Sequence, residues 1–364
     1  MNILQIVSNM KKNGPAMVVF DLSYGLAEMG HTVYIAAGNG ELEKEIKHPN
    51  IHFVHIPIER VNGNIIKQVC SYVVNGILTY SRLKTLIREK NIEIINSHQP
   101  IPNIYAKNLS RQGGIPFVTT SHNVYQDSFL NRTYVSGDHV IAVSEKVLNN
   151  SISKFRVSKD RITCICNGIN PNRLKITQYY KSNGKFVIGT IAGLRKQKAL
   201  DNLIKAFALF HNKFCESKCV IVGSGAEEAY LKSLACELEI SESVEFWGFR
   251  SDVANVLASF DVFALSSEYE GLPISMLEAM ALKIPVVVTA VGGVPEVIVN
   301  QKNGLMIKYM DNETMAKYFE RLYIDELFRE QIGNAGYQTI CEKYNYLLMS
   351  QQYLNIYELL ISNQ

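Results

Sequence analysis

Residues 262–281 read VFALSSEYEGLPISMLEAMA, which predicts a buried strand, a short loop and a helix in direct succession. The apolar run Val262–Leu265 has the length of a strand in a parallel sheet. Pro273 suits the first position of a helix, because its missing N–H would have no partner there. The N–H groups of that first turn form a site for an anion, and Gly271 lets the backbone approach a ligand closely. The stretch therefore predicts an α/β domain that binds an anionic ligand where a strand gives way to a helix.

Two carboxylates flank this loop. Glu270 precedes the predicted helix and Glu278 lies about two turns inside it, so the first can reach past a bound phosphate and the second can lie beneath a nucleoside. Carboxylates accept paired hydrogen bonds from vicinal hydroxyls. The alternative is that Glu270 is a surface residue and Glu278 is an acidic residue favoured by the helix dipole.

Strands and helices alternate on both sides of this stretch. In the first half, strands are expected at Ile3–Val7, Thr32–Ala36, Ile51–Ile56, Ile92–Ile95, Phe117–Thr120 and His139–Val143, and helices near 15–29, 64–90, 100–112 and 145–155. In the second half, strands are expected at Phe186–Ile191, Lys218–Val222, Ser243–Trp247, Val262–Leu265, Val286–Thr289 and Gly304–Ile307, and helices near 199–213, 226–238, 251–259, 273–283 and 311–343. This alternation predicts an α/β fold with two Rossmann-like doubly wound domains that face one another across a cleft.

The length of 364 residues suits two domains, because single cores stop growing near about 250–300 residues. The polar segment Asn167–Gly184 is the expected linker. The expected domains are residues 1–170 and residues 171–344, with the aromatic and apolar segment 345–364 packing back on the first domain.

Charge and cysteine content narrow the class of protein. Residues 1–177 carry a net charge of +8 and residues 178–364 a net charge of −5, which gives the total of +3. The basic first half can attract an anionic membrane surface, although it can equally be a merely solvated surface. Seven cysteines without a CxxC pair fit neither a disulfide framework nor a zinc site. The apolar start Met1–Val7 indicates a strand, not a signal peptide, so we expect a cytoplasmic protein with peripheral contact at the inner face of the cell membrane.

Two glycine-containing loops follow predicted strands. Gly14 opens a helix directly after the first strand, which is again an anion site. Gly223, Ser224 and Gly225 form a turn after a strand and could hold a phosphate or a nucleoside. The turn lacks the third glycine and the acidic residue of a dinucleotide site, so a nicotinamide dehydrogenase has little support.

Two histidines end consecutive strands of the first half. A lone histidine is more often a structural residue, but His98 and His122 follow neighbouring strands, and this favours a functional role for His122. Ser144 also follows a strand and fits a helix N-cap. The segment Ile65–Lys90, apolar at first and basic later, fits either a helix that covers the sheet or one that rests on a membrane.

The pattern Glu270-x7-Glu278, with Gly-x-Pro inside it and Ala-Met-Ala after it, resembles the donor-binding signature of the GT-B glycosyltransferases of family 4, also called glycosyltransferase group 1. The resemblance extends over most of the chain and is strongest in residues 186–307. It implies that Glu270 holds hydroxyls of a donor sugar and Glu278 the ribose hydroxyls of its nucleotide. It also implies that backbone N–H groups of the loop receive the sugar and the diphosphate, those around Gly271, Leu272 and Pro273.

The resemblance includes residues 189–207, GTIAGLRKQKALDNLIKAF, where the family uses an arginine and a lysine to neutralise the leaving diphosphate. Fixed cations stabilise the negative charge that develops on the departing phosphate. Lys198 aligns with the lysine, but Gly193 stands where the arginine is usual, and Arg195 is the candidate replacement. Lys283 is a second departure, because the family commonly has glycine there.

The resemblance assigns further donor contacts. Phe249 lies in the loop that seats the base, and the donor set includes Gly14 and the turn Gly223–Gly225. His122 matches the histidine that touches the donor sugar near the reacting carbon, and His98 matches an acceptor-side position more loosely.

Together these features imply a retaining transferase. It would move a hexosyl or N-acetylhexosaminyl group from a nucleotide-sugar, UDP favoured over GDP, to a hydroxyl acceptor in the synthesis of a cell-surface polysaccharide or glycolipid. No cofactor, no metal and no nucleic-acid partner is expected. The alternatives are a nucleotide-sugar epimerase of the same fold and a sugar-nucleotide-binding protein that has lost catalysis, the second motivated by Gly193 and Lys283.

Overall fold

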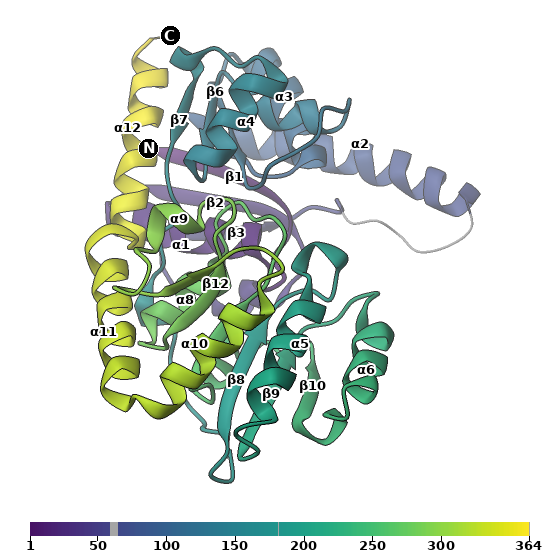
Figure 1. Ribbon diagram of the computed structural model, residues 1–364. Helices are drawn as coiled ribbons and strands as arrows, with labels where there is room; N and C mark the ends of the chain where they lie inside the picture. Colours follow the sequence, from purple (N-terminus) through teal and green to yellow (C-terminus); the bar gives the residue numbers. More distant parts are fainter. Residues whose placement is uncertain (59–64, 181, 364) are drawn as a thin grey trace. The chain divides into compact units, whose positions relative to one another are not determined.

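The computed structural model describes residues 1–58, 65–180 and 182–363, with the backbone alone for residues 65–73 (Figure 1). Residue 64 of the expected helix 64–90 and residue 181 of the expected linker lie outside the described residues. The chain forms two compact units. The N-terminal unit is Met1–Gly168 with the C-terminal segment that starts at Tyr346, and the C-terminal unit is Ile169–Asn345.

The N-terminal unit is built on a seven-stranded sheet with the order β3-β2-β1-β4-β5-β6-β7, in which every pairing is parallel. Its strands are β1 (Asn2–Asn9), β2 (Thr32–Gly38), β3 (Ile51–His55), β4 (Ile94–Ser97), β5 (Phe117–Ser121), β6 (His139–Ala142) and β7 (Ile162–Cys164). Ile3 of β1 pairs with Val33 on one side and with Ile94 on the other. The strand order reverses between β1 and β4, and open parallel sheets bind ligands at such a switch point.

Helices cover both faces of this sheet. They are α1 (Gly14–Glu28), α2 (Ile65–Glu89), α3 (Pro100–Gly113), α4 (Glu145–Phe155) and α12 (Tyr346–Ser362). Alternate residues of β1 face opposite ways. Leu4 and Ile6 pack with Leu83 of α2 and Leu109 of α3, whereas the side chain of Gln5 reaches α12 on the other face. The parallel sheet and its helices confirm the predicted fold class for this half of the chain.

Side-chain caps start two of these helices. The expected cap at Ser144 is confirmed, because its hydroxyl accepts a hydrogen bond from the amide of Val147. Asn13 caps α1 in the same way by accepting from the amide of Ala16. Each cap satisfies a helix N–H that would otherwise have no partner.

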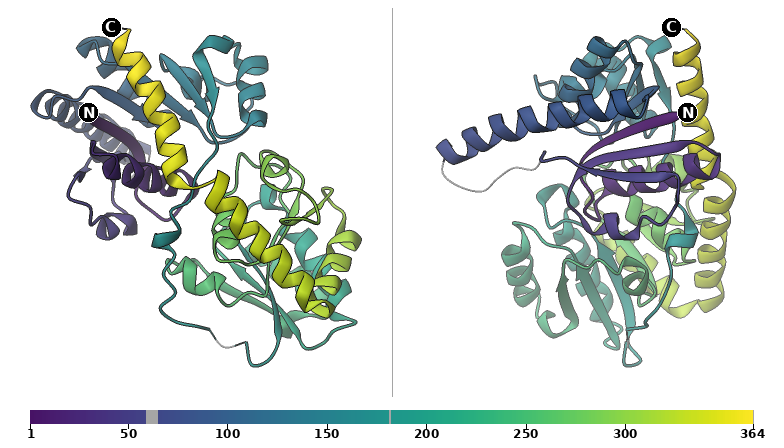
Figure 2. Two further views of the ribbon diagram at one scale, coloured as in Figure 1. Left: turned by 90° about the vertical axis from the view of Figure 1, so that its left-hand side faces the viewer. Right: turned by 180° about the vertical axis from the view of Figure 1, so that it is seen from behind.

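The C-terminal helix α12 packs closely along α1 (Figure 2). A Cβ atom added to Gly25 would lie 2.2 Å from Ser350 Oγ, so the glycine permits the close approach. The Tyr346 hydroxyl donates to the Glu28 carboxylate across the same seam at 2.7 Å. The segment from Tyr346 onward is therefore an integral part of the N-terminal unit.

The C-terminal unit is built on a six-stranded parallel sheet with the order β10-β9-β8-β11-β12-β13. Its strands are β8 (Phe186–Ile191), β9 (Ser217–Val222), β10 (Val244–Gly248), β11 (Val262–Leu265), β12 (Val286–Thr289) and β13 (Leu305–Ile307). The order reverses between β8 and β11. The loops that follow these two strands contain Lys198 and Glu270, so the topology brings both residues to one switch point.

The helices of this unit differ from expectation in three places. They are α5 (Leu200–His211), α6 (Glu228–Glu237), α7 (Val253–Leu257), α8 (Ile274–Ala281), α9 (Val294–Val297), α10 (Asn312–Ile324) and α11 (Glu326–Lys343). The single helix expected over 311–343 is wrong, because Asp325 leaves helical geometry and its side chain caps α11 by accepting from the amide of Phe328. The short helix α9 was not expected. Pro273 is the N-cap of α8 and not its first residue, with φ −72° and ψ 117°.

Within the described ranges, no helix is both long and apolar enough to span a lipid bilayer.

Candidate active site

Two buried serines hold the loop between β11 and α8 in place. The Ser266 hydroxyl donates to the carbonyl oxygens of Lys198 and Ala199 at 3.1 and 2.8 Å, which ties this loop to the one that follows β8. The Ser267 hydroxyl donates to Glu270 Oε1 at 2.6 Å. Ala199 has φ +44°, a left-handed conformation that is uncommon for a residue with a Cβ. The two loops therefore stabilise each other in one arrangement.

A second loop, which follows β12, packs against the backbone of the loop between β11 and α8. Gly292 has φ +59°, and a Cβ at this position would lie 1.9 Å from the carbonyl oxygen of Glu270. The amide of Gly293 donates to the carbonyl oxygen of Gly271 at 2.6 Å. Only glycine fits at position 292, and this approach holds the backbone of the predicted sugar-binding loop.

Lys198 and Glu270 form an ion pair at this switch point. Lys198 lies on the short 3₁₀ helix Lys196–Lys198, and its Nζ is 2.5 Å from Glu270 Oε1. The lysine side chain is 21% exposed and the glutamate side chain 8% exposed, so the pair lies at a partly covered surface of the unit. Two residues that the sequence places 72 positions apart, and to which the resemblance gives complementary roles, are thus in direct contact.

Glu278 is also paired with a cation. Its Oε1 accepts from Nη1 of Arg173 at 2.8 Å, and both side chains are about nine-tenths buried. Arg173 belongs to the 3₁₀ helix Pro171–Arg173 in the segment that enters this unit. The sequence analysis missed Arg173, whose only sequence signal is a cation within an otherwise uncharged turn.

The turn after β9 packs against the loop after β8. A Cβ at Gly223 would lie 1.9 Å from the carbonyl oxygen of Ala192, and one at Gly225 would lie 2.2 Å from that of Leu194. Ser224 accepts a hydrogen bond from the amide of Leu194 through its carbonyl oxygen. Backbone packing alone thus requires both glycines, and the role of the turn in donor binding stays a prediction.

Arg195 lies beside the position where the family's arginine is missing. A Cβ added to Gly193 would lie 3.7 Å from Nε of Arg195, which is ordinary contact distance. The Arg195 side chain is exposed. Its guanidinium group therefore lies next to residue 193, and its role as the replacement stays a prediction.

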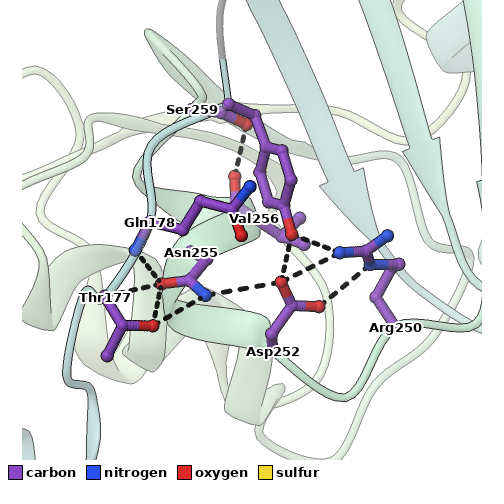
Figure 3. Close-up of polar contacts among 8 residues, drawn as sticks. Thr177, Gln178, Arg250, Asp252, Asn255, Val256 and Ser259 are labelled. Atoms are coloured by element: carbon purple, nitrogen blue, oxygen red, sulfur yellow. Dashed lines mark hydrogen bonds and ion pairs between the residues drawn. The ribbon is translucent and has the colours of Figure 1, made fainter.

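Phe249 is 52% exposed in the loop after β10, and the residues that follow it are held by a polar cluster. Arg250 Nε donates to Asp252 Oδ1 at 2.9 Å (Figure 3). The Tyr180 hydroxyl donates to Asp252 Oδ2 at 2.5 Å. The Arg250 guanidinium, and then the Tyr180 hydroxyl, hold the pKa of Asp252 well below its ordinary value. The loop that carries Phe249 is therefore fixed by charge-assisted hydrogen bonds.

The same cluster anchors the segment that enters the unit. Asn255 Oδ1 accepts from the amides of Thr177 at 2.8 Å and Gln178 at 3.1 Å (Figure 3). The Arg250 guanidinium also contacts the Tyr180 hydroxyl and lies over its ring. Residues 177–180 are thus tied to α7 and to the Phe249 loop.

In the N-terminal unit the structure brings His98 and His122 together. His98 Nδ1 lies 3.1 Å from His122 Nε2, and the rings stack with centroids 5.3 Å apart. His98 is fully buried and His122 is half-buried. Burial lowers the pKa of His122 to about 4, and burial together with the neighbouring ring lowers the pKa of His98. Both rings are therefore neutral near pH 7.

Gly14 begins α1 in open surroundings, with no atom within 4 Å of an added Cβ. Pro15 lacks an N–H, and the amide of Ala16 already donates to Asn13. The helix end consequently offers fewer N–H groups to an anion than its position alone predicts.

The cavities described in the N-terminal unit lie away from the predicted site residues. One, of about 450 Å³, opens where β5 and β6 begin, next to Lys107, Arg111 and Arg161. The other, of about 530 Å³, lies between α2 and α3. Neither has a lining residue in common with the predicted site. That no metal or cofactor takes part stays a prediction.

Two family models match the chain in succession. "Glycosyltransferase Family 4" matches residues 12–173, and "Glycosyl transferases group 1" matches residues 173–339. Among curated relatives, the N-acetyl-alpha-D-glucosaminyl L-malate synthase of Bacillus anthracis is 27% identical over 363 residues, covering 94% of this chain and 93% of its own length. The capsular polysaccharide biosynthesis glycosyltransferase CapM of Staphylococcus aureus is 26% identical, covering 60% of each chain.

Among solved structures, Anabaena Alr3699/HepE in complex with UDP and glucose has a TM-score of 0.78 with 18% sequence identity, and the match covers 97% of this chain and 98% of the other. WaaG, a glycosyltransferase involved in lipopolysaccharide biosynthesis, has a TM-score of 0.70 with 14% identity, covering 96% and 98%. These likenesses confirm the GT-B fold of two Rossmann-like α/β domains.

Proposed function

The chain is a glycosyltransferase of the group 1 and family 4 type with the GT-B fold, and we propose that it moves a hexosyl or N-acetylhexosaminyl group from a UDP-sugar to a hydroxyl acceptor with retention of configuration. The single observation that carries the proposal is the contact between Lys198 Nζ and Glu270 Oε1 at the switch point of the C-terminal sheet. A sugar diphosphate presents negative phosphates beside neutral hydroxyls. A cation can bind the phosphates and a neighbouring carboxylate can accept hydrogen bonds from the hydroxyls.

In the proposed reaction this ion pair opens when the donor binds. The diphosphate takes the place of Glu270 as the partner of Lys198, and the sugar hydroxyls donate to the carboxylate in place of the ammonium group. The Ser267 hydroxyl, 2.6 Å from Glu270 Oε1, keeps the carboxylate in position during the exchange. Lys198 then stabilises the charge that grows on the leaving phosphate.

Bond changes at the sugar follow from this placement. The bond from the anomeric carbon to the phosphate oxygen breaks, the acceptor oxygen bonds to the same face of that carbon, and the departing phosphate oxygen takes the acceptor's proton. Glu270 and Glu278 each lie against a cation, Lys198 and Arg173, and we assign both carboxylates to binding and not to attack on the sugar. Arg195, beside Gly193, is the second cation we assign to the diphosphate.

The preference for UDP is supported by the Anabaena structure, which is described as a complex with UDP and glucose. The N-acetylhexosaminyl group is supported by the Bacillus anthracis relative, which is named an N-acetyl-alpha-D-glucosaminyl L-malate synthase. The Staphylococcus aureus relative is named for capsular polysaccharide biosynthesis, which supports a glycan or lipid-linked acceptor. We assign Glu278 to the ribose and the loop at Phe249 to the base.

Peripheral contact with an anionic membrane is supported by helix α2. Val74, Ile77 and Leu78 are 55%, 66% and 44% exposed, and their spacing places them on one helix face. Lys84 and Arg88 follow on the same helix, where they can meet anionic headgroups.

The experiment that tests the function combines binding and turnover. Thermal-shift measurements with UDP-, GDP- and ADP-sugars should show the largest stabilisation with a UDP-sugar, since a ligand stabilises the state that binds it. Labelled donor is then incubated with and without a panel of hydroxyl acceptors. Product that depends on an acceptor supports transfer, epimerised free sugar without an acceptor indicates the epimerase, and tight binding without any product indicates a protein that has lost catalysis.

A further inference from the structure

A buried chain of hydrogen bonds connects His122 with the C-terminal helix. His122 Nε2 lies 3.1 Å from His98 Nδ1, and His98 Nε2 lies 2.8 Å from Gln5 Oε1. Gln5 Nε2 donates to the Tyr357 hydroxyl at 3.3 Å. Gln5, His98 and Tyr357 are fully buried, and all of these residues belong to the N-terminal unit.

The far end of this chain is fixed by further side chains. Asn96 Nδ2 donates to the Tyr357 hydroxyl at 2.8 Å, and Asn96 Oδ1 accepts from Thr120 Oγ1 at 3.1 Å. Thr120 Oγ1 in turn lies 3.3 Å from the hydroxyl of Tyr353, one turn from Tyr357 on α12. Two tyrosines of the C-terminal helix thus hold polar side chains of three central strands, β1, β4 and β5.

With Gln5 Oε1 facing His98 and Gln5 Nε2 facing Tyr357, the direction of these bonds determines which nitrogens of the histidines carry hydrogen. The Gln5 amide oxygen can only accept, so His98 Nε2 must be the donor. A neutral His98 then has no hydrogen on Nδ1, so His122 Nε2 must donate to it. A neutral His122 consequently keeps Nδ1 as an acceptor, and no hydrogen bond from the described residues reaches that nitrogen. Burial keeps both rings neutral because it lowers the pKa of each.

We propose that Gln5 and Tyr357 are positioning residues that hold His122 in the Nε2–H tautomer, so that its Nδ1 accepts a hydrogen bond from a sugar hydroxyl of the bound donor. The identity of that hydroxyl as part of a sugar rests on the proposed function. The tautomer itself rests on the contacts of the ligand-free protein. A histidine locked in one tautomer selects a donor group over an acceptor, so the C-terminal helix contributes to substrate recognition without touching the substrate.

The test uses the full-length protein labelled with ¹⁵N-histidine. Two-bond ¹H–¹⁵N correlation spectra distinguish Nε2–H from Nδ1–H rings, and the His122→Asn variant assigns the signals of His122. We expect a single Nε2–H tautomer for His122 in the wild type. In Tyr357→Phe the amide of Gln5 loses its acceptor, and we expect the Nδ1–H form of His122 to become populated.

The matched control is Tyr353→Phe, which removes a hydroxyl from the same buried helix face without touching Gln5. It should lower thermal stability by a similar amount and leave the tautomer of His122 unchanged. With a sugar donor, Tyr357→Phe should lower kcat/KM by between about twofold and tenfold, the effect of one hydrogen bond, and Tyr353→Phe should leave it unchanged.

An Nδ1–H ring for His122 in the wild type would overturn the inference, as would a tautomer that does not respond to Tyr357→Phe. A tautomer that responds while kcat/KM stays unchanged would overturn the role in recognition. If the wild type turns over no sugar donor, the proposed function fails, but the spectra of the ligand-free protein still decide whether Gln5 and Tyr357 set the tautomer.

Discussion

At the scale of single residues, the two carboxylates of the predicted donor site are each paired with a cation. Glu270 is bonded to Lys198 and Glu278 to Arg173, so each carboxylate is neutralised inside a largely buried environment. Removing one partner of such a pair leaves an uncompensated charge, which is costly. The pairs therefore hold the donor-side side chains in place.

Lys198→Ala should lower kcat by about 100- to 1000-fold, because a well-placed charge on a leaving group contributes on the order of 3 to 4 kcal/mol to the transition state. The matched control is Lys196→Ala, which removes a lysine from the same 3₁₀ helix. Steady-state kinetics with a UDP-sugar measure both variants, and thermal melting checks that each is folded. Equal rates in the two variants would show that Lys198 does not act on the leaving group.

The histidine pair predicts a pH dependence of stability. The folded-state pKa of His122 is about 4, whereas an unfolded histidine titrates near about 6.5. The unfolded chain therefore binds protons first, so the stability present above pH 6.5 is lost as the pH falls toward 4. The loss from His122 is at most about 3.5 kcal/mol, since the two pKa values differ by about 2.5 and one pKa unit corresponds to about 1.4 kcal/mol. Between pH 7 and pH 5, the free energy of unfolding measured with urea should decline less in His122→Asn than in the wild type. An identical decline in the two proteins would contradict the buried, neutral ring of His122.

Some site residues can be predicted from the sequence and others cannot. Glu270 and Lys198 lie in loops after strands, where a local pattern indicates function. Gln5 and Arg173 carry no such signal, because Gln5 reads as one polar residue in a buried strand and Arg173 as a cation in a turn. Their partners Tyr357 and Glu278 are 352 and 105 positions away in the chain, and only the tertiary structure brings them together.

At the scale of elements, the seam between α1 and α12 depends on a small residue. Gly25→Ala should lower the free energy of unfolding by about 1 to 3 kcal/mol, because the new Cβ would lie 2.2 Å from Ser350 Oγ and 3.1 Å from the carbonyl oxygen of Tyr346. Gly76→Ala in α2 is the matched control. Its new Cβ would meet only the end of the flexible Tyr105 side chain at 3.2 Å. The free energy of unfolding of this variant should therefore rise by up to about 1 kcal/mol.

Chemical denaturation measures the free energy of unfolding of both variants. Adding Ser350→Gly to Gly25→Ala should restore part of the lost stability by removing the clashing side chain. A Gly25→Ala variant as stable as Gly76→Ala would mean that the seam can relax without cost.

Helix α2 predicts binding to anionic lipid. Ile77→Asp with Leu78→Asp should lower the partition of the protein onto vesicles containing phosphatidylglycerol by about tenfold or more, because burial of each apolar side chain contributes about 1.5 to 3 kcal/mol. The control variant carries Ile324→Asp with Leu327→Asp, which are 66% and 79% exposed in the C-terminal unit. Co-sedimentation measures both, and an equal loss in the control, or no binding by the wild type, would exclude α2 as the contact.

The boundaries of elements show where local patterns mislead. Residues 311–343 have an uninterrupted helical pattern, yet Asp325 ends α10 and starts α11. A residue that can end one helix can also cap the next, and the choice depends on how the two helices pack on the unit. The predicted start of α8 at Pro273 is off by one position, since an N-cap and a first helical residue differ only in backbone angles.

At the scale of the whole molecule, two parallel sheets could be predicted because the alternation of strands and helices restarts after the linker. Both sheets reverse their order at an inner strand. Lys198 and Glu270 follow the two strands that flank the reversal of the second sheet, and His98 follows one of those that flank the reversal of the first. The switch points are a consequence of strand order, and strand order follows from packing between distant segments. The sequence pattern indicates the strands but not the order in which they lie.

The proposed function predicts the stereochemistry of transfer. Inversion needs a base that takes the acceptor's proton on the face of the sugar opposite the leaving group. A ring whose pKa is about 4, such as His122, is a poor base at pH 7, and the proposed reaction uses Glu270 and Glu278 to bind the donor. Among the groups assigned to the reaction, the departing phosphate is then the best base, and it lies on the face of the sugar from which it departs. Transfer from an α-linked UDP-sugar should therefore give an α-linked product, measured by the anomeric ¹H coupling in NMR spectra of the first product formed. A β-linked product would require another base and would overturn the front-face reaction.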